Sequence, residues 1–349
     1  MLSRRRFLGY SALAASTSAI SLKSSTLFAA TAVAYPTSKT GGMVGYAKEA
    51  NVTGGWGGET VFVRSLNEFV NAVAGNTKRV VVLANNIKVS QLTKVMLGSN
   101  KTIVGSYSYH TLSNIHLRTQ AGSANIIFQN IKFAHDQNIN ANDDIQLYLT
   151  EGKGYWIDHC SFVGHAWSAN DNSLDKLLYV GAYADYVTLS YCLFQNHKYG
   201  VIIGYPQDGA ADVKYEGYPK MTICFNYYKN LLVRAPGLFR YGLFHIYNNV
   251  IRDYKDGITM HARASFISEN NYYTSSVPYS NPITWDKSAR GFYDSGSIYL
   301  QDGQPIAVNV PNNKVFNVNY TYKKFTANQI STLVPARAGA SDQQLNYLL

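Results

Sequence analysis

The amino-acid sequence predicts an all-β protein that winds as a parallel β-helix and carries a short cap helix near its N-terminal end. The chain of 349 residues contains 28 Tyr and 27 Gly, and only 15% of its residues are charged, which favours strands over helices. Short segments of alternating apolar and polar residues recur through the middle of the chain. No apolar run reaches 18 residues, so we expect no membrane-spanning helix.

The first 34 residues have the pattern of an export signal. Arg4, Arg5 and Arg6 form a basic start of the twin-arginine type, an apolar stretch covers residues 7–20, and Ala32-Val33-Ala34 offers a cleavage site. An ordinary secretory signal is the alternative. In either case we expect a secreted or periplasmic bacterial protein, in which residues 35–349 form a single domain.

The segment after the signal is expected to form a cap and the first coils. Residues 65–74 have helical periodicity, with Ser65 as N-cap and Glu68 at the third helical position, which is the pattern of a capping box. A helix at this place would shield the open end of a solenoid core. Residues 272–349 continue through further strands into a less regular tail.

The middle of the chain is divided by strand-end residues that we expect to stack in successive coils. Their intervals are 30, 32, 34, 23 and 22 residues, and they are Asn130, Cys160, Cys192, Asn226, Asn249 and Asn271. A period near 22 indicates a β-solenoid, in which stacked amides would form an internal ladder. The longer intervals predict extra loops of about 8–12 residues between Asn130 and Asn226. Loops on one side of the solenoid would frame a cleft that carries the function.

The three cysteines, Cys160, Cys192 and Cys224, are expected to be buried free thiols. An odd number in an exported chain does not make a disulfide framework, and a twin-arginine substrate folds in a reducing compartment before export. A Cys160–Cys192 bridge is the alternative. The spacing of the cysteines does not fit a zinc site.

The charge of the chain indicates an acidic partner. The net charge is +10, and without the four basic residues of the signal 27 basic and 21 acidic residues leave +6. A uronate polymer, nucleic acid or a charged surface would suit such a chain, and solubility alone is the simpler explanation.

Several motifs occur together along residues 35–349. The segment Trp156–Phe162 (WIDHCSF) is accompanied by related segments at 45–47, 53–58, 99–105, 185–191, 234–249 and 338–340. This combination resembles family 1 polysaccharide lyases, the pectate and pectin lyase group. The resemblance implies a single-stranded right-handed parallel β-helix and an enzyme that acts on an acidic, uronate-containing glycan. We therefore expect an acidic polysaccharide as partner, no nucleic acid or membrane, and a monomer.

The resemblance also implies cleavage by β-elimination, in which a base removes the C5 proton of a uronate and the 4-linked oxygen leaves. By match to the family motif Arg234 is the base, while Arg240 and Lys198 bind the substrate. An arginine base needs a cationic or calcium-rich site, or alkaline pH, because its pKa is ordinarily above about 12. A β-helix glycoside hydrolase with paired carboxylates and a non-catalytic glycan-binding protein are the alternatives.

Only half of the family's calcium-binding acids are present. Asp143 and Asp175 match two of them, whereas Ala141 and Tyr179 stand in the other two places and Lys176 adds a positive charge. Calcium takes six to eight oxygen ligands and gains affinity from their charge. The sequence therefore predicts a weak calcium site at Asp143 and Asp175, and the alternative is that both are merely acids in the wall of the cleft.

Two further departures concern substrate binding. Strict counting puts Tyr199 in the place of the family's lysine, so Lys198 can take that role only if the strand bulges there. One extra residue precedes Arg240, which alters the reach of its side chain. The adjacent Asp158 and His159 look like an acid–base pair, but the resemblance implies a structural role for them.

Overall fold

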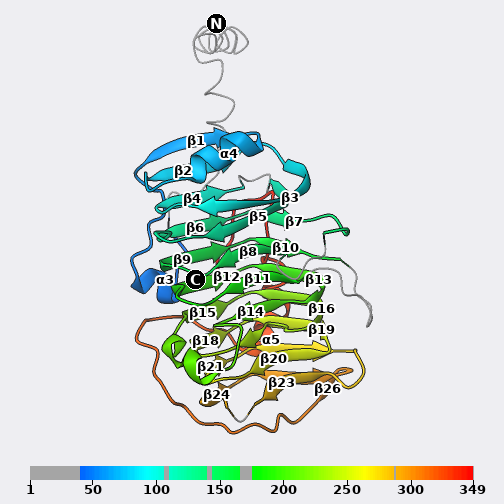
Figure 1. Cartoon of the computed structure of the whole chain (residues 1–349). Coiled ribbons are helices and arrows are strands. Elements are labelled where there is room, and N and C mark those ends of the chain that lie inside the picture. The colour runs from blue at the N-terminus through cyan, green and yellow to red at the C-terminus, as the bar shows by residue number, and fades with distance from the viewer. Residues whose placement is uncertain (1–39, 106–109, 140–143, 166–174, 287, 349) are drawn as a thin grey trace, which may run out of the picture.

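The computed structural model describes residues 40–105, 110–139, 144–165, 175–286 and 288–348. Over these ranges the chain winds as a parallel β-helix with three short strands in each full coil (Figure 1), so the predicted fold class is confirmed. The signal predicted at residues 1–34 lies outside the described residues. None of the described helices is long and apolar enough to cross a membrane.

One side of the coil stack is a ten-stranded parallel sheet, called the first sheet. Its strands follow one another in chain order, so each coil lies beside the next. They are β1 (Glu59–Val63), β2 (Arg79–Leu83), β4 (Lys101–Val104), β6 (Ile126–Gln129), β9 (Lys153–Asp158), β12 (Asp185–Ser190), β15 (Lys220–Cys224), β18 (Leu243–Tyr247), β21 (Ser265–Glu269) and β24 (Gly291–Ser295).

The other sixteen strands form two further faces that meet at β5 (Thr111–Thr119), which also pairs with β3 (Ile87–Leu97). The second face contains β7 (Lys132–Ala134), β10 (Ser161–Val163), β13 (Leu193–Tyr199), β16 (Tyr227–Val233), β19 (Val250–Tyr254), β22 (Tyr272–Ser275), β25 (Ile298–Gln301) and the antiparallel β26 (Gln304–Pro305). The third face contains β8 (Ile145–Leu149), β11 (Lys176–Val180), β14 (Val201–Ile203), β17 (Leu238–Phe239), β20 (Asp256–Met260) and β23 (Asn281–Trp285).

Apolar side chains from all three faces fill the inside of the coils. Phe133, Phe162, Phe194 and Tyr228 occupy one position of four successive coils, and their ring centroids are 4.9, 4.7 and 4.9 Å apart. These separations match the spacing of hydrogen-bonded strands, about 4.7–4.9 Å, so the rings stack without a gap. The alternation seen in the sequence is thus the alternation between core and surface.

The predicted ladder lies at the turn between the first sheet and the second face. The side-chain oxygen of Asn249 accepts hydrogen bonds from the backbone and amide nitrogens of Asn226, both at 3.0 Å. Asn271 accepts the same pair of bonds from Asn249, at 2.9 and 3.0 Å. Cys192 donates its backbone N–H to Asn226. The stack is confirmed from Cys160 to Asn271.

The prediction that Asn130 belongs to this stack was wrong by one residue. Its N–H bonds the carbonyl of Asp158, as that of His159 bonds Ser190, so Asn130 and His159 are equivalent. Both have a left-handed backbone, with φ of 57° and 47°. Ile131 takes the inward place in that coil. Asn is favoured at left-handed positions as well as in an amide ladder, so the residue type alone did not decide the register.

The cysteines are free and buried, as predicted. Cys160 and Cys192 belong to the stacked positions, and Cys224 ends β15. Burial raises the pKa of Cys192 and of Cys224, so both remain thiols and pack as apolar groups.

The cap helix is confirmed as α4 (Leu66–Val73). Ser65 accepts from the backbone N–H of Glu68, as a capping box requires. The carboxylate of Glu68 reaches back to the N–H of Arg64 instead of Ser65, so the reciprocal bond lies one residue earlier than expected. Phe69 and Val73 are buried against the end of the core.

The outer face of the first sheet is covered by the N-terminal segment that contains α3 (Gly45–Glu49). Threonines on the strands accept from this segment: Thr222 from the N–H of Tyr46 and Thr188 from the N–H of Ala47. Gly45 has φ of 68°, and a Cβ there would lie 2.2 Å from Thr222. Only glycine fits that contact, which explains the GYA motif in physical terms.

The C-terminal tail runs back over the same side of the molecule, from β24 towards the coil of β6. Asn248 and Asn270 both donate to the carbonyl of Phe325, and α5 (Ala327–Leu333) then packs on β22. Further on, the tail bonds Asn130 through Ser341 and Asp158 through Tyr347. The tail therefore fastens coils that are far apart in the sequence.

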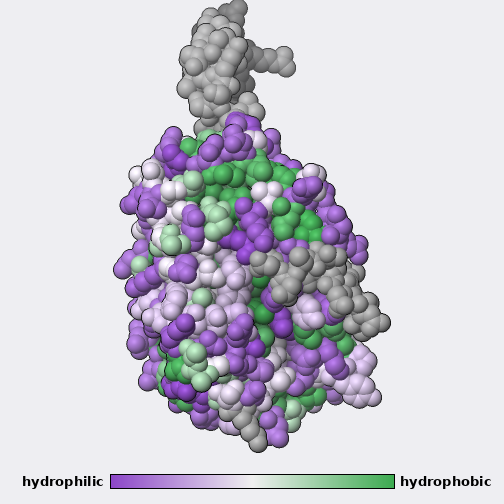
Figure 2. Space-filling view, viewed as in Figure 1, coloured by the Kyte–Doolittle hydropathy of each residue, from purple (hydrophilic) through white to green (hydrophobic). Residues whose placement is uncertain are grey.

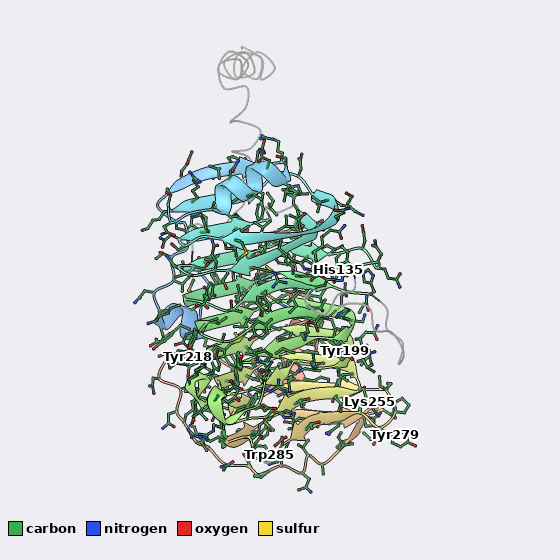
Figure 3. The ribbon with its side chains drawn as sticks, in the orientation of Figure 1. His135, Tyr199, Tyr218, Lys255, Tyr279 and Trp285 are labelled. Carbon is green, nitrogen blue, oxygen red and sulfur yellow. The ribbon has the colours of Figure 1, made fainter. Side chains whose placement is uncertain are left out.

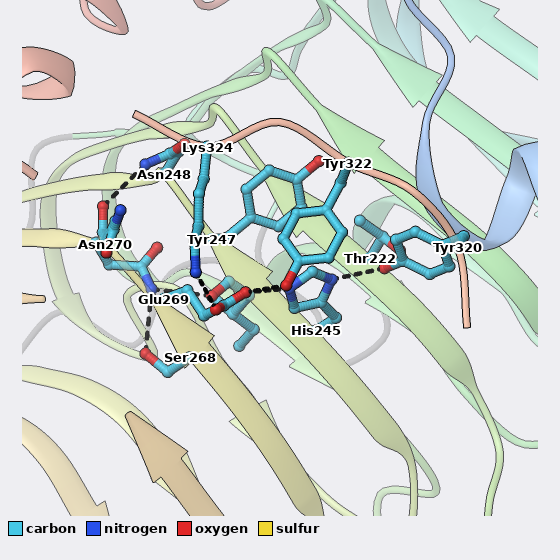
Figure 4. Close-up of polar contacts among 12 residues, drawn as sticks. Thr222, His245, Tyr247, Asn248, Ser268, Glu269, Asn270, Tyr320, Tyr322 and Lys324 are labelled. Atoms are coloured by element: carbon cyan, nitrogen blue, oxygen red, sulfur yellow. Dashed lines mark hydrogen bonds and ion pairs between the residues drawn. The ribbon is translucent and has the colours of Figure 1, made fainter. Parts of the chain in front are cut away.

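A buried carboxylate, Glu269 on β21, anchors this tail (Figure 4). His245 lies 3.0 Å from it, the Tyr322 hydroxyl donates at 2.5 Å, and Lys324 forms an ion pair with it. Burial alone would raise the pKa of Glu269, but the bonds from His245, Lys324 and Tyr322 outweigh it and lower the pKa to about 2.

We expect Glu269 to make the protein acid-sensitive. Its folded pKa lies below the ordinary 4.5, so its contribution is complete above that pH and is lost as the pH falls towards 2. Glu269→Gln should lower Tm at pH 7 and flatten the dependence of Tm on pH in the acid range, as thermal melts would show. Glu59→Gln, whose side chain is 65% exposed, is the matched control. Equal acid profiles for Glu269→Gln and the wild type would contradict this role.

Candidate active site

Residues 204–219 leave the coil between the third face and the first sheet. The segments that join β7 to β8 and β10 to β11, between the second and third faces, lie partly outside the described residues. The long connection at 204–219 agrees with the predicted extra loops. The expectation that all of these loops lie on one side stays a prediction. In the view of Figure 2, the largest hydrophobic area lies near the top of the molecule, and smaller hydrophobic areas are scattered among hydrophilic residues below it.

The third face carries an aromatic and apolar strip. Tyr148 and Tyr179 stack with their centroids 4.6 Å apart, and the guanidinium of Arg118 lies 4.5 Å from the ring of Tyr148. In the next coils Ile202 and Leu238 continue the same register. These side chains pack together outside the core. Tyr179, Ile202 and Leu238 are buried, and Tyr148 is half-buried.

Of the predicted calcium site, the structure describes Asp175 and Tyr179. Tyr179 stands in the place of one acid and contributes a stacked ring, and burial raises its pKa, so it stays a neutral phenol. Asp175 is buried and forms an ion pair with Lys176. Asp143 lies outside the described residues. Among the described residues no group of three or more His, Cys, Asp or Glu is arranged to hold a metal.

Arg234 follows β16 in a left-handed conformation, with φ of 63°. Its carbonyl accepts from the N–H of Val201, and a Cβ at Gly200 would come within 2.2 Å of that carbonyl, so glycine is required there. The guanidinium lies 4.8 Å from the centre of the Tyr199 ring.

The surroundings of Arg234 favour its neutral form more than water does. Burial is the largest effect and lowers the pKa of Arg234. Asp175 and Tyr199 oppose this shift, and the positive charge of Arg240 adds to it. Arg234, Asp175 and Arg240 are therefore brought within electrostatic range of one another.

The strand that carries Lys198 departs from regular β geometry two residues before it. Asn196 in β13 has φ of 56°, and Asn230 in the next coil repeats this conformation with φ of 54°. Lys198 is buried, and its ammonium lies 5.4 Å from the ring of Tyr199. Lys198 and Arg234 thus both lie beside Tyr199, which sequence analysis treated only as a replacement for lysine.

Arg240 follows β17 on the opposite border of the third face. Its Nε donates to Asp208 of the 204–219 loop at 2.8 Å. His261, one coil further on, lies 3.8 Å from Asp208 and 3.1 Å from Asp286. Sequence analysis did not single out these two acids, because their approach to Arg240 depends on how a loop folds back.

Sequence analysis also missed a group of four histidines, His116, His135, His165 and His197. The ring of His135 lies 6.0, 5.1 and 6.3 Å from those of His116, His165 and His197. Burial and these neighbouring imidazoles lower the pKa of His135 to about 2, so its ring is neutral at ordinary pH. Figure 3 shows His135 on the same border as Tyr199, Lys255 and Tyr279. The intervals of 30 and 32 residues from His135 to His197 equal those of the coils and could have revealed the stack.

The tempting pair Asp158 and His159 lies elsewhere, under the C-terminal tail. Asp158 accepts from Tyr347 at 2.6 Å and from Ser190 at 2.8 Å, and His159 stacks on Tyr191. Both side chains are buried at the border of the first sheet and the second face.

Comparison with known proteins agrees with this fold. A family model described as pectate lyase matches residues 11–343. A pectin lyase of Pectobacterium carotovorum is 48% identical over 317 residues, which are 90% of this chain and 99% of that protein. A pectin lyase of Bacillus subtilis is 43% identical over 327 residues, or 90% and 92% of the two chains.

Solved structures show the same fold. A variant of a Xanthomonas campestris pectate lyase gives a TM-score of 0.68 at 24% identity, over 86% of this chain and 99% of that one. A pectate lyase bound to a hexasaccharide gives 0.74 at 19% identity, over 88% and 98%. Because the family model covers most of the chain and both pectin lyases align over 90% of it, the chain belongs to the pectate lyase family and is a polysaccharide lyase.

Proposed function

We propose that the protein cleaves methyl-esterified galacturonan by β-elimination and holds no tightly bound calcium in its resting state. The observation that carries this proposal is the aromatic and apolar strip in which Tyr179 stacks on Tyr148 where a calcium-binding acid is expected. An ester group suits such a surface, whereas a free carboxylate would lose hydration there. The naming of relatives at 43–48% identity as pectin lyases supports the same substrate.

Arg234 is the proposed base. It removes the C5 proton, the electrons of the C5–H bond form the C4–C5 double bond, and the C4–O bond breaks. The leaving oxygen takes up a proton, which the protonated Arg234 or water returns. The lowered pKa of Arg234 makes the neutral guanidine more accessible, and activity should therefore rise towards alkaline pH.

An ester reduces the need for metal at this step. Removing the C5 proton beside a carboxylate creates a dianion, whereas beside an ester it creates an enolate with a single negative charge. The cationic side chains of Lys198 and Arg240 are the proposed donors to that enolate or to the neighbouring sugars. Calcium would then bind only weakly, through Asp143, Asp175 and the substrate.

The test is a panel of galacturonans of graded esterification, assayed for ultraviolet-absorbing unsaturated product with and without chelator. We expect the highest kcat/KM on highly esterified pectin and little loss of activity with micromolar chelator. Calorimetric titration with calcium should detect no tight site. A Kd below about 1 μM would contradict the weak site, and product from de-esterified polymer alone would contradict the substrate.

The alternatives give other results in the same assay. A glycoside hydrolase would release reducing ends without ultraviolet absorbance, and it needs two carboxylates about 5–9.5 Å apart. A glycan-binding protein would bind without either signal. We also propose that residues 1–34 direct export and that the enzyme acts as a monomer outside the cytoplasm, which cell fractionation and light scattering would test.

A further inference from the structure

Asp208 forms an ion pair with Arg240, the arginine that is proposed to bind substrate. The Nε of Arg240 donates to Asp208 at 2.8 Å, and the arginine side chain is only 13% exposed while that of Asp208 is 46% exposed. Asp208 is therefore the more exposed partner of the ion pair. A substrate carboxylate that approaches Arg240 also comes close to the negative charge of Asp208.

The loop that carries Asp208 is fastened on both sides of it. The hydroxyl of Tyr241 donates to the carbonyl of Gln207 at 3.1 Å and accepts from the N–H of Gly209 at 3.4 Å. Within the same loop, which includes the 3-10 helix η1 (Ala210–Tyr215), Tyr205 stacks on Tyr215 at 4.0 Å. Asp208 is thus held in place by its own neighbours.

A second acid, Asp286, adds negative charge near Asp208. Arg240, His261 and Asp286 follow one another at the same border of β17, β20 and β23. His261 lies between the carboxylates, 3.8 Å from Asp208 and 3.1 Å from Asp286. Ser288 is the main cause that lowers the pKa of Asp286, so this acid stays charged.

We propose that Asp208 is a specificity-determining residue that neutralises Arg240 and makes this part of the cleft select a neutral, esterified sugar over a free uronate. The inference rests on the proposed function and assigns its ester preference to one side chain. With its charge balanced, Arg240 still has N–H donors for an ester carbonyl. A free carboxylate gains little from the paired guanidinium and is repelled by Asp208.

The test is Asp208→Asn, which keeps the shape of the side chain and removes its charge. We expect the ratio of kcat/KM on de-esterified to kcat/KM on highly esterified substrate to rise about two- to fivefold, the size typical of an exposed ion pair. Added salt should raise the wild-type ratio by screening Asp208 and should change the ratio of the variant less.

Two comparisons isolate the contact. Asp212→Asn removes the same charge from the same loop and should leave the ratio unchanged, because no ion pair joins Asp212 to Arg240 among the described residues. In an Arg240→Gln background, Asp208→Asn should raise the ratio by a smaller factor, because only the direct repulsion between Asp208 and a free carboxylate is then left to remove. An equal shift with Asp212→Asn, or an unchanged ratio with Asp208→Asn, would overturn the proposal.

Binding separates this proposal from the proposed function. Wild type and Asp208→Asn are titrated calorimetrically with hexagalacturonate and with its methyl ester. The variant should bind the free acid more tightly than the wild type does, and both proteins should bind the ester equally well. A wild type that yields no unsaturated product from pectin refutes the proposed function, whereas the titration still decides the role of Asp208. Equal affinities of both proteins for the free acid would reject that role.

Discussion

Arg234→Lys should fold normally and lose at least about a hundredfold in kcat. General-base catalysis contributes about 10²–10⁴-fold, and a displacement of about 1 Å at the reacting atoms can cost a hundredfold. Lysine keeps the charge but replaces a planar guanidinium, packed 4.8 Å from the Tyr199 ring centre, by a single ammonium on a flexible stem. Initial rates of ultraviolet product, measured across pH, would show the loss.

A matched substitution separates catalysis from packing. Arg252 on β19 also lies over a tyrosine, 6.0 Å from the ring of Tyr227, outside the proposed site. Arg252→Lys should keep near wild-type kcat, and both variants should keep the wild-type circular dichroism spectrum. Near-normal turnover of Arg234→Lys at its own pH optimum would show that another residue is the base.

Asn249→Ala should destabilise the protein by about 2–4 kcal/mol, because it leaves several buried polar groups without partners. The amide of Asn249 accepts from the backbone and side chain of Asn226 and donates to the carbonyls of Ile223 and Tyr247 as well as to Asn271. Alanine supplies none of these bonds and leaves a cavity in the ladder. Denaturant unfolding with an unchanged m-value would measure the loss.

Asn71→Ala is the control for this experiment, since Asn71 is exposed on α4. Its stability should change by less than about 0.5 kcal/mol. If Asn249→Ala also costs less than that, the amide stack is a by-product of the fold and does not stabilise it.

The coils could be predicted because their signal is periodic and local. Strand alternation and the intervals between Cys160, Cys192, Asn226, Asn249 and Asn271 reflect the repeated geometry of one coil. The error at Asn130 has a physical origin: two adjacent positions of the turn, one left-handed and one inward, both favour asparagine. Sequence alone could not choose between them without a second coil of the same length.

In the candidate site, too, some residues could be predicted from the sequence and others could not. Arg234 and Asp175 come from turns of the coil, and motif spacing was enough to bring them together. The ion pair of Asp208 with Arg240 depends on how a long loop folds back across a coil, and no periodic pattern encodes that path. The stacking of Tyr179 on Tyr148 could not be predicted either. In the sequence, a tyrosine in the place of an acid indicates only that a calcium ligand is missing.

The C-terminal tail has a consequence for how a shortened chain would fail. In a solenoid each coil contacts only its neighbours, so a premature stop normally frays one end. In this protein Tyr347 bonds Asp158 and Leu348 bonds Tyr191, so the tail covers coils that lie 189 and 157 residues earlier in the chain. A stop codon just before Tyr347 would therefore open the middle of the stack and leave the final coil intact.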